Sequence, residues 1–98
     1  MSIAINDVIA ERIRQIAKYP AEHDDGHDDG SIALAASCIA DPSGGLLQLS
    51  EPQVFFSGWE KGLARHIRAK HTHRQRLVVA AAMLVAEIER LDRKAGCE

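Results

Sequence analysis

The sequence predicts an all-α protein: a compact bundle of three or four helices with a long apolar C-terminal core helix and an irregular loop in the middle. Isoleucines recur at helical spacing near the start of the chain, and a second apolar run of helical character extends from position 77 to 91. The alternation that would indicate strands is weak and confined to the middle. Because the chain has 98 residues, we expect a single helical domain over residues 1–98.

The first predicted helix covers residues 5 to 18 and is amphipathic. Its apolar stripe, which we expect to pack on the core, consists of Ile5, Ile9, Ile13 and Ile16. The face expected to meet solvent carries Glu11, Arg12, Arg14 and Lys18. Asn6 or Asp7 is the predicted N-cap. Tyr19-Pro20 ends the helix, because the residue before a proline avoids the α region.

An acidic loop, AEHDDGHDDG at 21–30, leads to a second predicted helix over residues 31 to 40. This helix has few polar positions, so we expect it to be largely buried. Asp28 and Asp29 precede its positive N-terminal end, a favourable place for carboxylates. The segment DPSGG at 41–45 ends it.

Residues 43 to 59 have the least readable pattern. The segments LLQLS and QVFFS could form two short strands, but an isolated hairpin is marginally stable, so we favour an ordered apolar loop. The chain is helical by pattern from residue 60 onward, first basic and amphipathic to residue 70, then apolar on nearly all sides from 77 to 86. A capping box of Thr72 and Gln75 predicts a new helix there, and one continuous helix is the alternative. Gly96 is a natural C-cap.

The composition limits location and partners. The net charge of −2 gives no general reason to expect nucleic acid or an anionic membrane as partner. The longest apolar run is far shorter than the roughly 20 residues that span a bilayer. The chain does not begin like a signal peptide, so we expect a cytoplasmic protein. Of its two cysteines, we expect Cys38 to be a buried thiol and Cys97 a thiol near a frayed end.

The acidic loop is a candidate site for a divalent cation, because hard cations bind clustered oxygen ligands. Its carboxylates are those of Asp24, Asp25, Asp28 and Asp29. Glu89 and Asp92 lie on one face of the last helix and could complete such a site, as in metal-binding helix bundles. Three interpretations remain open: a Mg²⁺ or Mn²⁺ site, a transition-metal site that uses His23 and His27, and a solvated acidic turn.

The segment from residue 61 to 76 is strongly basic. It could receive the phosphates of a nucleotide, a nucleic-acid backbone or an acidic protein surface. No base-reading motif accompanies it, so we do not expect a nucleic-acid partner. A solvated helix face paired with acidic residues is the alternative interpretation.

Three blocks of the sequence are distinctive: ERIRQ at 11–15, YPAEHDDGHDDG at 19–30 and RLVVAAAMLVAEIERLDR at 76–93. Together they resemble a group of small phage and prophage proteins, and the HDD-x-H and AEIERLDR parts are the most specific. Ser31 stands where that pattern usually has Glu. The group in turn looks distantly like the all-α nucleoside triphosphate pyrophosphohydrolases, which bind Mg²⁺ with carboxylates from several helices. That second likeness is one of class and not of motif.

The first functional hypothesis is a phage-type helical protein that binds a nucleotide and Mg²⁺ or Mn²⁺ and is similar to a pyrophosphohydrolase. The predicted metal ligands are Asp24, Asp25, Glu89 and Asp92. The candidate catalytic or orienting residues are Glu11, His23 and His27. The candidate phosphate-binding residues are Arg12, Arg14 and Lys61. This hypothesis requires the carboxylates of the loop and of the last helix to converge in one cleft.

The second hypothesis is a non-enzymatic phage accessory or anti-defence protein, for example an anti-CRISPR protein, that binds a host protein complex. It allows the same charged groups to lie apart, so the sequence leaves open whether the protein is an enzyme. In either case we expect a homodimer, because apolar residues in the middle exceed what short helices easily cover. Those residues are Leu46, Leu47, Leu49, Phe55, Phe56 and Trp59.

Overall fold

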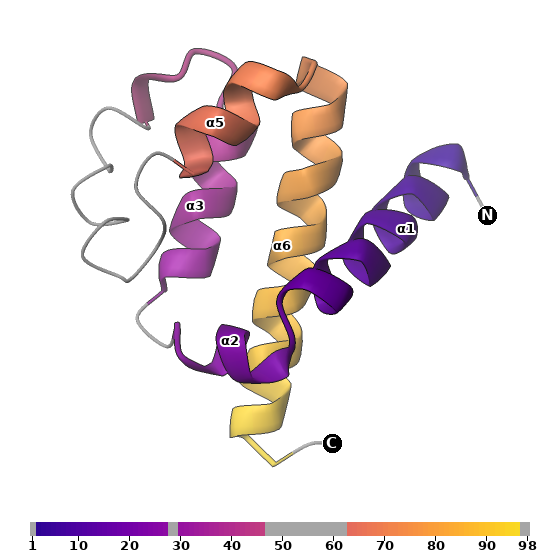
Figure 1. The fold of residues 1–98 in the computed structure, drawn as a ribbon, viewed down its shortest axis with the longest axis vertical. Helices are drawn as coiled ribbons and strands as arrows, with labels where there is room; N and C mark the ends of the chain where they lie inside the picture. The colour runs from indigo at the N-terminus through magenta and orange to yellow at the C-terminus, as the bar shows by residue number, and fades with distance from the viewer. Residues whose placement is uncertain (1, 28–29, 47–62, 97–98) are drawn as a thin grey trace.

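The computed structural model describes residues 2–27, 30–46 and 63–96. Within these ranges the chain forms helices and no strand, so the all-α prediction is confirmed. The helices are α1 (Ile3–Lys18), α2 (Ala21–Asp25), α3 (Ser31–Ala40), α5 (Leu63–Lys70) and α6 (His73–Lys94) (Figure 1). None of the helices in the described part of the chain is long and apolar enough to cross a membrane.

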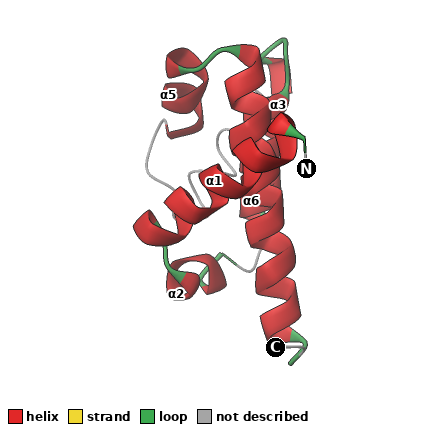
Figure 2. Cartoon of the chain, turned by 90° about the vertical axis from the view of Figure 1, so that its right-hand side faces the viewer, coloured by secondary structure: helices red, strands yellow, loops and turns green. Residues whose placement is uncertain are grey.

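The long helix α6 runs through the middle of the molecule (Figure 1). Helices α3 and α5 lie on one side of it and pack on each other, and α3 makes the main contact with α6. Helix α1 lies on the other side and crosses α6 at a steep angle (Figure 2). The short helix α2 connects α1 towards α3 and also contacts α6. Two different helix pairs, α3–α6 and α1–α6, therefore share one central helix.

The hydrophobic core lies between α3 and α6. It consists of Ile32, Ala35, Ala36, Cys38, Ile39, Val79, Ala80 and Met83. Many of these side chains are small, which lets the two helix backbones approach closely, and Met83 fills the space that they leave. The predictions of a buried second helix, a buried Cys38 and a C-terminal core helix are all confirmed.

Helix α1 begins earlier than predicted. Ser2 is its N-cap, with the hydroxyl oxygen accepting a hydrogen bond from the Ile5 amide at 3.2 Å, so the prediction of Asn6 or Asp7 was wrong. Both of those residues lie inside the helix. A serine at this position satisfies one of the free amides of the first turn as well as Asn or Asp would. The helix ends at Tyr19, as predicted from the following proline.

The orientation predicted for α1 was also wrong. Its four stripe isoleucines are 44–63 % exposed, whereas Arg12 and Gln15 are buried at 9 % and 7 %. The apolar face of α6 is already filled by α3, and the flank that α1 meets presents polar partners instead. Gln15 donates to the carbonyl of Val79 at 3.4 Å, and Arg12 pairs with Glu89. Because that flank supplies polar partners, α1 packs with its polar side inward.

Of the remaining fold predictions, some are confirmed and one is wrong. The capping box of Thr72 and Gln75 is present and starts α6 separately from α5, which excludes one continuous helix. Gly96 follows the end of α6 with a φ of 75°, as expected for a C-terminal glycine. Part of the predicted acidic loop is instead the short helix α2, whose N-cap is Pro20. The prediction for residues 43–59 lies mostly outside the described residues.

Helix α6 is the predicted core helix, but its outward face is exposed. Four large side chains there are exposed by 44–57 %: Leu77, Leu84, Ile88 and Leu91. They lie opposite the core-facing residues of the same helix, because a single helix cannot be covered all round by the helices packed on its other faces.

Candidate functional site

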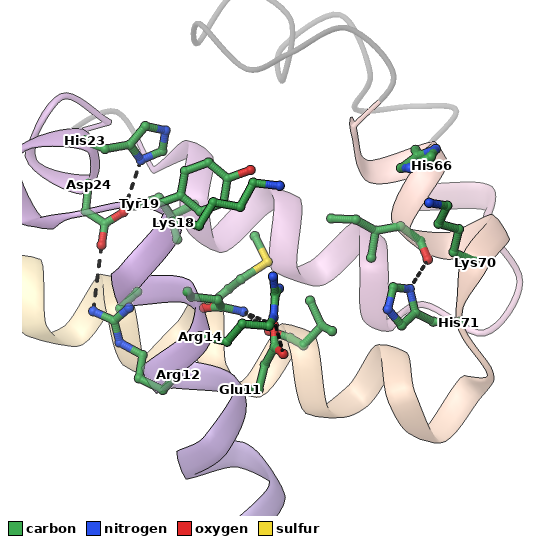
Figure 3. Close-up of a pocket in the computed structure, with 16 residues that line it drawn as sticks. Glu11, Arg12, Arg14, Lys18, Tyr19, His23, Asp24, His66, Lys70 and His71 are labelled. Carbon is green, nitrogen blue, oxygen red and sulfur yellow. Dashed lines mark hydrogen bonds and ion pairs between the residues drawn. The ribbon is translucent and has the colours of Figure 1, made fainter.

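A pocket of about 300 Å³ lies between α1 and α5, with α2 at one end and α6 below (Figure 3). Its floor is apolar and consists of Ile32, Ile67, Val79, Met83 and Ala86. Its walls are polar and consist of Glu11, Arg12, Arg14, Gln15, Lys18, Tyr19, His23, Asp24, His66, Lys70 and His71. An apolar floor with a few convergent polar groups is typical of a small-molecule site.

The rim of this pocket is basic on both sides. Arg14 and Lys18 extend from α1, and His66 and Lys70 face them from α5 (Figure 3). Arg14 and Lys18 are one helical turn apart, which places both on the same side of α1. The pocket therefore offers several cationic side chains to the negatively charged end of a ligand.

Glu11 is the carboxylate on the α1 wall, and it already has partners. Arg14 donates to it twice, at 2.9 Å and 2.7 Å, and the Gln15 amide donates at 2.9 Å. The hydrogen bonds from Arg14 are the largest influence on Glu11 and hold its pKa below the ordinary value of 4.5. Glu11 thus stays ionised at neutral pH and positions Arg14 at the rim.

A partly buried charge cluster closes the end of the pocket next to α2. Arg12 lies between two carboxylates: it donates to one oxygen of Glu89 from Nε at 2.8 Å and from Nη2 at 2.5 Å, and its Nη2 is 3.8 Å from Asp24 Oδ2. Asp24 is 6 % exposed, and its Oδ2 atom has no hydrogen-bond donor within the described part of the structure. A buried carboxylate oxygen of this kind can accept a hydrogen bond from a ligand or a water molecule.

Aromatic rings form a short row beside Asp24. The ring of His23 lies 4.7 Å from that of Tyr19 and 4.8 Å from that of His27, measured between centroids. Nδ1 of His23 is 3.3 Å from Asp24 Oδ1, and Nδ1 of His27 is 3.2 Å from the Ser31 hydroxyl oxygen. Tyr19 and His23 line the pocket, and His27 is buried behind them. The row therefore gives the pocket an aromatic wall.

The predicted metal ligands are largely paired with arginines. Asp24 and Glu89 converge on Arg12, and Asp25 accepts a hydrogen bond from Arg93 at 2.8 Å. Asp92 is exposed on α6. Among the described residues, no three His, Cys, Asp or Glu side chains lie close enough together to hold a metal ion. Within the described residues, the loop and the last helix converge around the guanidinium of Arg12. Asp28 and Asp29 lie outside the described residues, so the metal site stays a prediction.

The basic segment predicted for phosphate binding is partly used inside the fold. Arg68 donates from Nη1 to the carbonyls of Cys38, Ile39 and Asp41 at the end of α3. Arg74 pairs with Asp7 of α1 at 2.9 Å, and Arg76 donates to the His71 carbonyl. Lys61 lies outside the described residues. These arginines hold helices together, and His66, Lys70 and His71 are the members of the segment that line the pocket.

The pocket contains residues that sequence reasoning missed. The sequence predicts a solvent-facing Lys18 and a helix-ending Tyr19, and it marks His66 and Lys70 only as members of a basic segment. The spacing of Arg14 and Lys18 by four residues, followed by Tyr19 and His23 also four residues apart, could have indicated a basic and an aromatic patch at the end of α1.

Comparison with protein-family models, with curated proteins and with solved structures finds no match for this chain. The resemblance to small phage and prophage proteins therefore stays a prediction. The class of protein defined by the fold is a small all-α protein with a basic-rimmed pocket beside its central helix.

Proposed function

We propose that the protein binds a nucleotide or a closely similar phosphate ester in the pocket between α1 and α5. The observation that carries the proposal is the combination in one pocket of a basic rim, an apolar floor and an aromatic wall. The phosphates would meet Lys18 and Lys70, and the base would pack against Tyr19.

A divalent cation, Mg²⁺ or Mn²⁺, would enter as the counter-ion of the phosphates. The carboxylates nearest the pocket are engaged by arginines, and among the described residues no three His, Cys, Asp or Glu side chains lie close enough together to hold the ion. If the pocket also hydrolyses its ligand, His23 is the side chain suited to act as a general base, because it lines the pocket and is oriented by Asp24.

Calorimetric titration with ATP, with and without Mg²⁺, tests the binding proposal. We expect the double variant Lys18→Gln with Lys70→Gln to weaken ATP binding about tenfold or more, since two cationic contacts are lost. The matched control is Lys94→Gln, which removes an exposed lysine at the end of α6 and should leave binding unchanged. Adenosine and inorganic triphosphate as separate probes show which part of the ligand is recognised.

Two results would reject the proposal: no heat with millimolar ATP, or equal ATP affinity in the double variant and the wild type. Release of pyrophosphate from ATP by the wild type, lost in His23→Ala, would support a pyrophosphohydrolase-like activity in addition to binding. ATP binding without such release would identify a nucleotide-binding protein that is not a hydrolase.

A second candidate function is favoured by one specific observation, the exposed isoleucine stripe of α1. Large apolar surfaces of this kind mark sites of protein association. We propose on this basis that the protein is a homodimer. A phage accessory or anti-defence protein could use the same exposed stripe to bind a host complex. The mass of the purified protein in solution tells the two cases apart: a dimer mass indicates self-association, and a monomer mass indicates that the stripe needs another partner.

A further inference from the structure

The outward face of α6 carries a regular apolar stripe. Its residues follow the alternating four- and three-residue spacing of a coiled coil and are Leu77, Ala81, Leu84, Ile88 and Leu91. The four large members are 44–57 % exposed, and Ala81 is half-buried. This spacing keeps one seam facing a partner helix along the whole length of α6.

The isoleucine stripe of α1 adjoins this seam. Helix α1 contacts α6 through Arg12 and Gln15, and the pocket lies on the side of that contact where α1 carries Glu11, Arg14 and Lys18. At about 100° per residue, the isoleucines fall on the opposite side of the contact, towards the outward face of α6. The two stripes therefore form one continuous apolar face, on the side of the molecule away from the pocket.

The size of this face is that of a dimer interface. If a fully exposed Leu or Ile presents about 200 Å², the eight large side chains expose roughly 800 Å², the area that each partner buries in a standard interface. It also exceeds the largest apolar patch of a typical monomer, about 300–600 Å².

We infer that the occupant of this face is a second copy of the chain, with the two α6 helices antiparallel about a two-fold axis. This inference rests on the homodimer proposed above and names its surface and geometry. An antiparallel seam pairs Leu77 of one protomer with Ile88 of its partner, and the small Ala81 of one with the larger Leu84 of the other. Large side chains thus pack opposite small ones at the centre of the seam.

Charges flanking the seam favour the antiparallel direction. In that register Arg74, which also pairs with Asp7 of its own chain, lies near Asp92 of the partner subunit, so opposite charges are close at both ends. A parallel pair would instead bring Glu87 beside Asp92 of the partner subunit, which places like charges together. The two-fold axis also puts both α1 helices on the same side of the α6 pair. Their isoleucine stripes then face each other and complete a four-helix layer.

Light scattering of the purified chain and its variants tests the surface. We expect a dimer for the wild type and a monomer with unchanged helical circular dichroism for Ile88→Glu and for Ile13→Glu. The matched control is Ile3→Glu, because Ile3 is 76 % exposed on the same helix but lies off the stripe, and it should remain a dimer. If a variant loses helicity, the wild type itself provides the test by thermal unfolding at several protein concentrations. A Tm that rises with concentration supports the inference, and a constant Tm overturns it.

Disulfide trapping tests the direction. In a background with Cys97→Ser, we expect a mixture of Leu77→Cys and Ile88→Cys chains to form the mixed disulfide on oxidation. Cross-linking of each variant with itself would indicate a parallel pair and overturn the geometry. A monomeric wild type would reject the homodimer altogether, whereas a dimer that persists in Ile88→Glu and Ile13→Glu would reject only this surface.

Discussion

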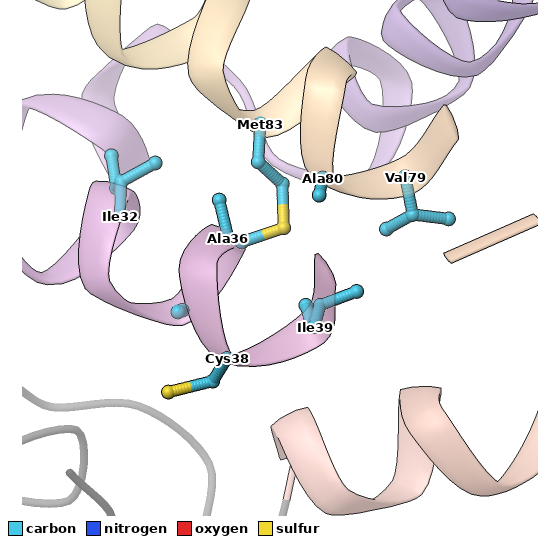
Figure 4. Packing of buried hydrophobic residues seen from close by; sticks show 8 residues of the cluster. Ile32, Ala36, Cys38, Ile39, Val79, Ala80 and Met83 are labelled. Carbon is cyan, nitrogen blue, oxygen red and sulfur yellow. The ribbon is translucent and has the colours of Figure 1, made fainter. Parts of the chain in front are cut away.

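The two helices that flank α6 are held to it by different kinds of contact. Helix α3 packs with apolar side chains, of which Ile39 and Ala36 are each 1 % exposed, and Met83 of α6 points towards Ala36 (Figure 4). Helix α1 contributes no residue to this core cluster. It is held by the pair of the buried Arg12 with the half-exposed Glu89, by the Gln15 amide and by the ion pair of Asp7 with Arg74.

The two kinds of contact contribute differently to the stability and to the position of the helices. An apolar contact gains most of its free energy from removing surface from water, so α3 and α6 form a core that does not depend on the charge state of particular groups. A polar contact specifies position through directional bonds but contributes less net stability. By turning its polar side inward, α1 forms one wall of the pocket and leaves its isoleucines available for a second chain.

The largest expected effect lies in the apolar contact. Met83→Asp should prevent folding, because it places an unpaired charge in a core where it has no partner. The neighbouring change Leu84→Asp is the control, since Leu84 is 45 % exposed on the outward face, and helical circular dichroism should survive it. A cooperative, wild-type-like melt of Met83→Asp would show that this helix pair does not carry the fold.

The next largest loss of stability is expected from substitutions in the polar contact between α1 and α6. Arg12→Ala leaves the buried carboxylate of Asp24 without its counter-charge, and we expect it to cost about 2–4 kcal/mol in urea unfolding and to increase proteolysis within α1. Arg14→Ala removes an exposed arginine two positions away and should cost about 1 kcal/mol or less. Equal losses for the two variants would contradict a special role for the buried arginine.

A third prediction concerns the backbone carbonyls at the C-terminal end of α3, which take part in neither of these two contacts with α6. Arg68 satisfies carbonyls at the end of α3, and Arg68→Ala should lower the free energy of unfolding by about 2 kcal/mol, because hydrogen bonds to a charged donor are lost. Arg68→Lys keeps the charge and some donors and should recover part of that loss. If Arg68→Lys is as unstable as Arg68→Ala, charge near these carbonyls is not what stabilises them.

The smallest expected effect is the pH dependence of the α1 wall. Since the pKa of Glu11 is lower in the folded protein than its ordinary value of 4.5, its contribution is present above pH 4.5. It is lost as the pH falls through the folded pKa. Glu11→Gln should therefore lose about 1 kcal/mol or less at neutral pH and show a shallower fall in stability below pH 4.5. Parallel pH profiles for the two proteins would exclude this contribution.

Helix boundaries could be read from local sequence because they depend on neighbouring residues. The span of α3, the capping box at Thr72 and the end of α1 before Pro20 all follow from backbone preferences within a few residues. The burial of Met83 and Cys38 also followed, since their segments are apolar over several consecutive turns. Of the predicted site residues, Glu11, Arg12, Arg14, His23 and Asp24 line the pocket, and their functional roles stay predictions.

The direction in which α1 faces was decided only by tertiary structure. The isoleucine stripe predicts burial, yet the helix meets a surface of α6 that offers Glu89, the Val79 carbonyl and, from α2, Asp24. Likewise, only the fold shows that the guanidinium of Arg12, which lies 12 residues earlier in the chain, sits beside Asp24. The cation predicted from the four clustered aspartates stays a prediction, because Asp28 and Asp29 lie outside the described residues. Local sequence determines which face of a helix is apolar. Which partner that face meets depends on the surfaces left uncovered by every other element, and this is a property of the assembled fold.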